Sequence, residues 1–76
     1  MKLAIEPTSK LVALDGLDCR VWEGVDDQGV RVHCYIARVA IPIDSSDDVT
    51  DRFARRLRET RAPSAEVLAI PARLIL

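Results

Sequence analysis

The sequence has few of the residues from which metal sites and catalytic centres are usually built. It contains one histidine, two cysteines and three glycines among 76 residues. A structural zinc site takes four ligands, whereas Cys19, His33 and Cys34 supply three. His33 and Cys34 are adjacent, so in a strand they point to opposite faces and do not form a nucleophile with its base. There is also no glycine-rich phosphate loop. We therefore expect no metal, no cofactor and no enzymatic activity.

Aromatic side chains, net charge and long apolar runs are also scarce. Aromatic residues make up 4% of the chain, so a core must come from the aliphatic residues within the 49% that are hydrophobic. A formal net charge of −1 gives no overall attraction to nucleic acid or anionic lipid. No segment approaches the ~20 apolar residues of a membrane span, and the first residues lack the apolar core of a signal peptide. We expect a soluble cytoplasmic protein with reduced thiols.

The length predicts one small domain over residues 1–76. A domain of this size buries only about 60% of the surface that its unfolded chain exposes, so we expect the chain to have low stability as a monomer. Within it, alternating apolar residues predict an antiparallel meander over residues 10–41, preceded by a short edge strand at residues 2–6. Pro7 interrupts that first strand because proline lacks the N–H that a β-ladder needs.

Two turns organise the meander. Asp15-Gly16 accepts the positive φ angles of a type I′ turn, which joins two strands by a two-residue loop. The second turn lies in residues 25–29, and here two rules favour different strand registers. If Gly24 faces Gly29, one face is apolar, Cys19 lies opposite Cys34, and Trp22 and Tyr35 share the other face.

The alternative register follows from the turn itself. If residues 26–29 form a type I turn with Gly29 in the left-handed conformation, Trp22 instead joins Val32 and Cys34. We slightly favour the first register, because burying an apolar face stabilises more than a preferred turn. His33 is expected on the wetter face, near Arg20 or Glu23 according to the register. The apolar alternation slips near residues 37–38, which predicts a bulge or a second buried face there.

A single helix is predicted over residues 47–60. Ser45 or Ser46 can cap it, and Asp47 and Asp48 in its first turn complement the positive end of the helix dipole. An apolar stripe at a spacing of four residues is expected to pack the helix on the sheet. The stripe consists of Val49, Phe53 and Leu57.

The last segment, residues 66–76, alternates strictly and predicts a C-terminal strand. Leu68, Ile70, Ala72, Leu74 and Leu76 share one side, and Pro71 on the other side indicates an edge position or a bulge. Together these elements predict an α+β fold, an antiparallel β-meander of about four strands with the helix packed on the sheet. The apolar C-terminal strand needs cover, which favours a homodimer or another protein partner. Trp22, Tyr35, Leu74 and Leu76 are the candidate interface residues.

Arginines give the helix a second candidate role. Five of the eleven basic residues lie between positions 52 and 61. A basic helix can bind a phosphate backbone, with Trp22 or Tyr35 as a stacking ring. Neighbouring acidic residues and the neutral net charge favour a solvated helix face instead. The candidate nucleic-acid contacts are Arg52, Arg55, Arg56 and Arg58.

Three short stretches carry a resemblance to known proteins. They are Ile-Glu-Pro-Thr at residues 5–8, Arg-Val-Trp-Glu-Gly at residues 20–24, and Gly-Val-x-Val-x-x-x-Ile-x-Arg-Val at residues 29–39. Over about half the chain the sequence resembles a group of short bacteriophage and prophage proteins with no assigned activity. The resemblance implies a bacterial cytoplasmic setting and an accessory role, and it brings no catalytic or binding residues. We expect a small non-enzymatic interaction module, with nucleic-acid binding as the alternative.

Overall fold

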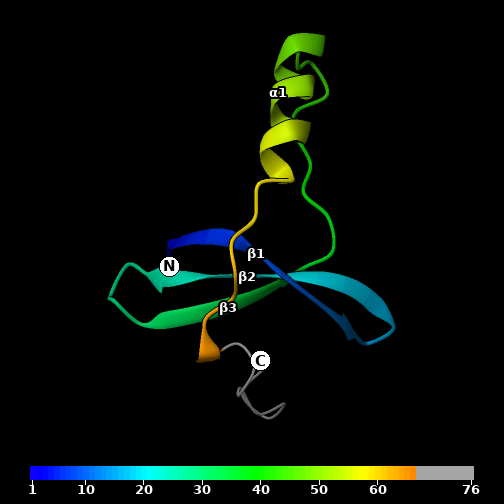
Figure 1. The fold of residues 1–76 in the computed structure, drawn as a ribbon. Coiled ribbons are helices and arrows are strands. Elements are labelled where there is room, and N and C mark those ends of the chain that lie inside the picture. Colours follow the sequence, from blue (N-terminus) through cyan, green and yellow to red (C-terminus); the bar gives the residue numbers. More distant parts are fainter. Residues whose placement is uncertain (67–76) are drawn as a thin grey trace.

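The computed structural model describes residues 1–66, which form a three-stranded antiparallel sheet and a helix that stands away from it (Figure 1). The strands are β1 (Leu3–Leu14), β2 (Leu17–Asp26) and β3 (Arg31–Ile36), in the spatial order β1-β2-β3. The helix α1 spans Asp47–Leu57. The predicted α+β class is therefore confirmed. The predicted C-terminal strand, with Leu74 and Leu76, lies outside the described residues.

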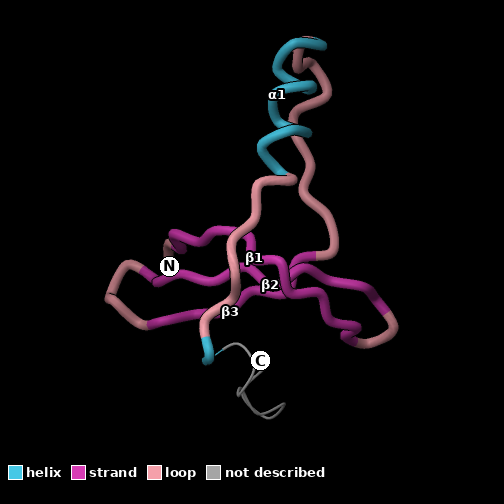
Figure 2. The backbone as a smooth tube through the Cα atoms, in the orientation of Figure 1, coloured by secondary structure: helices cyan, strands magenta, loops and turns pink. Residues whose placement is uncertain are grey.

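The first hairpin forms as its turn residues predict. Asp15 and Gly16 have φ angles of 53° and 80°, and Leu14 pairs directly with Leu17 across them. Both central residues of a type I′ turn need positive φ, which Gly adopts freely and Asp tolerates. Figure 2 shows the two hairpins that this turn and residues 27–30 close.

The second hairpin adopts the register that we did not favour. Trp22 pairs with Cys34 and Glu23 with His33. The turn decides this register: Gly29 has φ +82°, and Oδ1 of Asp26 accepts hydrogen bonds from the backbone N–H groups of Gln28 and Val30. The hydrogen bonds of this turn favour the observed register over the one that would give a fully apolar face. Cys19 and Cys34 consequently lie on opposite faces, and both are free thiols.

β1 is one strand with a bulge, whereas the sequence predicts two strands separated at Pro7. Pro7 pairs with Trp22 and Leu11 with Arg20, so residues 8–10 oppose Val21 alone. Thr8 holds the bulge: its Oγ1 donates to the Val21 carbonyl at 2.7 Å and accepts from the Lys10 N–H at 3.2 Å. A threonine hydroxyl therefore replaces the ladder bonds that the bulge breaks.

Gly24 allows the two long strands to approach closely. A Cβ at this position would lie 1.9 Å from the Ala4 carbonyl oxygen and 2.8 Å from the Ile5 Cα. Both neighbours are backbone atoms, so they cannot move aside as a flexible side chain would. Only glycine fits where β1 crosses β2 at this distance.

The sheet has a buried face and a half-exposed face. We call the face with Cys19, Val21 and Glu23 the core face, because these three are the buried residues of β2. The opposite face carries Trp22, Cys34 and Ile36, and we call it the tryptophan face. Among residues 1–66, Cys19 and Val21 are the only fully buried hydrophobic residues. The described part of the chain therefore encloses a very small apolar core.

α1 starts as predicted and ends earlier. Ser46 caps it, accepting from the Val49 N–H at 3.2 Å, and Asp47 and Asp48 lie in the first turn. The helix ends at Leu57 instead of residue 60. The N–H groups of Arg58 and Glu59 donate to the carbonyls three residues earlier, at Arg55 and Arg56, and so form tighter turns than an α-helix. Arg61 is then held in extended form by two backbone bonds to β1, from its N–H to Pro7 and from Ser9 to its carbonyl.

The prediction that the helix packs on the sheet is wrong. α1 points away from the sheet, and the chain reaches its N-terminus through residues 37–46, which run beside it (Figure 1). No residue of α1 is buried, and Val49 is 41% exposed. The core face is instead crossed by residues 59–66, which contact β1, β2 and β3 in turn.

Candidate functional site

Two sites stand out, one on each face of the sheet. On the core face, Glu23 continues the alternation of Cys19 and Val21 and is only 5% exposed. A carboxylate at such a position needs charge and hydrogen-bond partners, because burial without them is strongly unfavourable. The partners come from residues 61–64. They belong to the segment of residues 59–66, which we call the strap.

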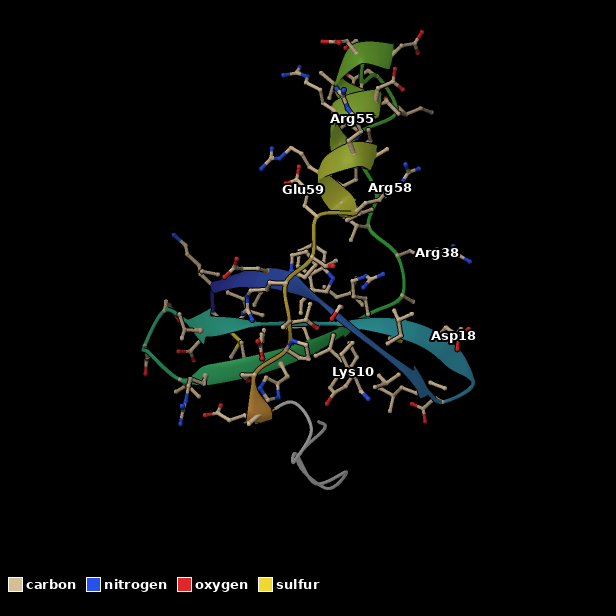
Figure 3. All side chains as sticks on the ribbon, in the orientation of Figure 1. Lys10, Asp18, Arg38, Arg55, Arg58 and Glu59 are labelled. Carbon is tan, nitrogen blue, oxygen red and sulfur yellow. The ribbon has the colours of Figure 1, made fainter. Side chains whose placement is uncertain are left out.

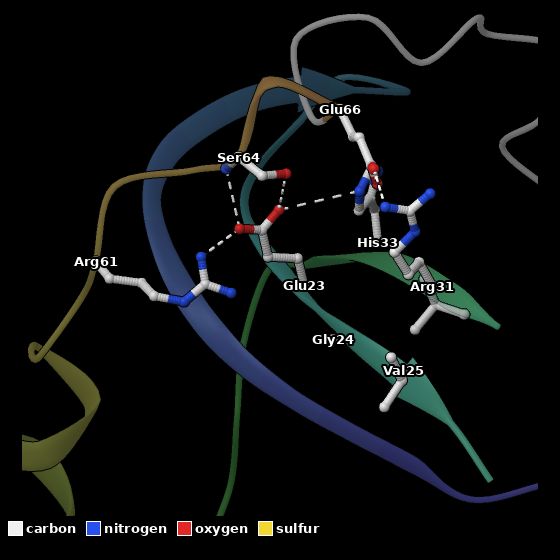
Figure 4. Close-up of a pocket in the computed structure, with 9 residues that line it drawn as sticks. Glu23, Gly24, Val25, Arg31, His33, Arg61, Ser64 and Glu66 are labelled. Atoms are coloured by element: carbon white, nitrogen blue, oxygen red, sulfur yellow. Dashed lines mark hydrogen bonds and ion pairs between the residues drawn. The ribbon is translucent and has the colours of Figure 1, made fainter. Parts of the chain in front are cut away.

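The strap satisfies both oxygens of Glu23 (Figure 4). The Arg61 guanidinium donates to Oε1, which also accepts from the Ser64 N–H at 3.0 Å. The Ser64 hydroxyl donates to Oε2 at 2.8 Å. Arg61 also lies 3.4 Å from Glu6 of β1, so it connects the core face to the sheet edge.

These contacts fix the charges of the cluster. Burial by itself raises the pKa of the Glu23 carboxyl, but hydrogen bonds from Arg61 and Ser64 and the charge of Arg61 outweigh it. The pKa of Glu23 therefore lies below its ordinary value of 4.5. The hydrogen bond to Glu23 also raises the pKa of Arg61. The pair is ionised at neutral pH and is unsuited to proton transfer.

His33 completes this side of the sheet. Its Nε2 lies 4.0 Å from Oε2 of Glu23, and its side chain is 9% exposed. The prediction that His33 lies near Glu23 in the alternative register is confirmed, whereas its expected wetter environment is not. Nδ1 of His33 is buried without a hydrogen-bond partner in the described chain. A cavity of about 290 Å³ lies beside His33 and Glu23, with the Arg31–Glu66 ion pair at its rim.

On the opposite face, Trp22 lies between two hollows at the base of α1. One, of about 390 Å³, is lined by Ile5, Pro7, Phe53 and Leu57. The other, of about 100 Å³, is lined by Ile36, Val39 and Leu57. Trp22 and Leu57 line both hollows, so we call the two together the tryptophan groove. It combines the half-exposed face of the sheet with the lower half of the apolar stripe of α1.

Basic side chains border the tryptophan groove. Arg56 lines the larger hollow, with Glu6 and Glu59, while Arg20 and Arg38 line the smaller one without an acidic residue. Arg20 is held in place by a 2.8 Å hydrogen bond from its Nη1 to the Thr8 carbonyl. Figure 3 shows Arg55 extending from α1, Arg58 at the end of the helix, and Arg38 on the segment that runs beside it.

The structure separates the residues that the sequence grouped together. Trp22 and Tyr35 were expected on one exposed face, but the observed register places Tyr35 opposite Val21 on the core face. Both rings are half-buried. The candidate contacts Arg52, Arg55 and Arg56 are exposed on α1, and Arg58 is exposed at its C-cap. Arg52 also lies 3.5 Å from Asp48, four residues earlier on the helix. Leu74 and Leu76 lie outside the described residues.

The strap contacts were missed from the sequence. The available signal was Glu23 itself, because it shares the parity of Cys19 and Val21 in a strand whose alternation was recognised. A buried carboxylate needs a cationic partner. From the sequence, Arg61 was considered only as one of the five basic residues between positions 52 and 61. Nothing local in the sequence identifies which arginine fulfils this role.

The comparisons place no known protein beside this chain: no family model, curated protein or solved structure matches it. Within residues 1–66, no three His, Cys, Asp or Glu side chains gather to hold a metal ion. None of the helices in that part of the chain has the length and apolar character needed to cross a membrane. The pKa of the Cys34 thiol is raised by burial, which makes it a weaker nucleophile at neutral pH.

Proposed function

We propose that this chain is a small non-enzymatic interaction module that works as a homodimer. Its resemblance to phage and prophage proteins supports an accessory role, carried out in the bacterial cytoplasm. The observation that carries the proposal is the apolar surface shared by the tryptophan groove and the projecting helix. A monomer leaves Phe53 and Leu57 half-buried and Val49 exposed.

The small core supports the same conclusion. A domain of this size has little stability to spare, and among the hydrophobic residues of the described chain only Cys19 and Val21 are buried. Large exposed hydrophobic residues include Ile43 and Val49 on the projecting part of the chain. Exposed apolar side chains beside an apolar groove are typical of an interaction surface.

The concentration dependence of unfolding tests the proposal. Folding that is linked to dimerisation makes the thermal midpoint rise with protein concentration. We expect the midpoint to rise by several degrees between about 1 µM and about 200 µM. A midpoint that is the same at both concentrations contradicts the homodimer.

Nucleic-acid binding is the second candidate, and one observation favours it. Trp22 lies in the groove with Arg20 and Arg38 on one side and Arg56 on the other. An aromatic ring between cations can stack a base while the arginines contact phosphates. The acidic Glu6 and Glu59 in the larger hollow oppose such contacts, which ranks this candidate second.

A further inference from the structure

The two ends of the projecting part of the chain carry opposite charges. We call residues 37–58 the arm, residues 43–48 its tip, and the end at the tryptophan groove its foot. Resting on the proposed homodimer, we infer that two arms lie side by side in opposite directions, so that each tip occupies the tryptophan groove of the other copy.

The tip is apolar and acidic. Ile43 is fully exposed there, and Val49 just beyond it is 41% exposed. Asp44, Asp47 and Asp48 are their near neighbours in the sequence and are exposed as well. The tip therefore presents an apolar side chain bordered by carboxylates.

The foot has the complementary composition. Its smaller hollow has an apolar floor that includes Trp22 and Ile36, and its charged residues are Arg20 and Arg38. In the larger hollow Arg56 is accompanied by Glu6 and Glu59, but Glu6 lies 3.4 Å from Arg61 and is partly neutralised. An acidic segment with an exposed Ile side chain matches the smaller hollow in both charge and polarity.

The arm has a length that suits an antiparallel pair. The eleven residues of α1 span about 16 Å at 1.5 Å per residue, with the acidic first turn at one end and the basic last turn at the other. Opposite directions bring each acidic end beside a basic end, and a two-fold axis makes the contact twice. Parallel arms would place acidic ends together and basic ends together.

A charge-reversal experiment tests the arrangement in the full chain. Asp44→Arg reverses the tip and Arg38→Glu reverses the foot, and both residues are exposed and lie outside α1. Each variant alone should weaken dimerisation about tenfold at low salt, because like charges meet at both contacts. An equimolar mixture should recover the wild-type dimer affinity, because each tip then meets a foot of opposite charge. Sedimentation equilibrium measures all three constants.

A matched control reverses a charge elsewhere. Asp27→Arg changes an exposed residue of the β2–β3 turn and should leave the dimer affinity unchanged. If the wild-type protein dimerises but the single variants do so equally well, or the mixture shows no recovery, the antiparallel arrangement is overturned while the homodimer stands. A wild-type protein that is monomeric at every concentration overturns both.

Discussion

Glu23 and Arg61 are separated by 38 positions in the sequence and form an ion pair on the core face of the sheet. This pair, with Ser64, attaches the strap to β2, and the strap follows α1 directly in the chain. The buried carboxylate and Trp22 are neighbours in β2 that point to opposite faces of the sheet.

Replacing Glu23 by Gln should destabilise the fold by about 1.5 to 3 kcal/mol, because hydrogen bonds to a charged group contribute that much and the Arg61 charge loses its main partner. Urea unfolding followed by circular dichroism measures the change. Glu6→Gln is the matched control: its carboxylate is 68% exposed, and exposed pairs contribute little. Equal losses in the two variants would show that the buried cluster has no special role.

Acid should weaken the fold through the same carboxylate. The pKa of Glu23 is lowered in the folded protein, so the folded state favours the ionised form. This stabilisation is complete above the ordinary value of 4.5 and is lost as the pH falls through the lower folded-state pKa. Urea unfolding between pH 7 and about pH 3 should show a loss below about pH 4.5 that is smaller in Glu23→Gln. An identical pH profile in both proteins argues against this linkage.

Gly24→Ala tests the close crossing of β1 and β2. The new Cβ would overlap the Ala4 carbonyl oxygen, so β1 must shift, and we expect a loss of about 3 kcal/mol or more. Gly16→Ala is the comparison, because Gly16 has open space around it and only its positive φ opposes alanine, by about 1 to 2 kcal/mol. Thermal melts at one protein concentration give both values. A Gly24→Ala protein as stable as Gly16→Ala would show that the strands do not approach so closely.

The nucleic-acid alternative makes a prediction about salt. Each phosphate contact on duplex DNA contributes about −0.9 to the slope of log affinity against log salt. If the helix binds DNA, changing Arg52 and Arg56 to Gln should flatten the slope by about 2. Titrations with mixed-sequence duplex and with single strands from low salt upward measure it. No binding at low salt, or a slope that the double change leaves intact, removes this alternative.

Local signals in the sequence predicted the local structure well. Asp15-Gly16 formed the expected turn, and Ser46, Asp47 and Asp48 began the helix where capping and dipole arguments place it. Each of these features depends on a few neighbouring residues whose backbone preferences are strong.

Longer-range features were predicted less well, for identifiable reasons. The β2–β3 register follows the turn in which the Asp26 side chain accepts hydrogen bonds from the N–H groups of Gln28 and Val30, whereas the expectation rested on an apolar face. The strap that occupies the core face is attached by Glu23 and Arg61, which meet across 38 residues. No periodicity encodes such a contact, so the tryptophan groove could be anticipated only through Trp22 itself.

Static light scattering on the wild-type protein at neutral pH tests the homodimer most directly. At about 200 µM protein and low salt we expect a mass twice the 8.4 kDa of one chain, decreasing toward 8.4 kDa on dilution. A constant mass of 8.4 kDa across the whole range would contradict the homodimer and leave the exposed apolar surface of α1 to a different partner.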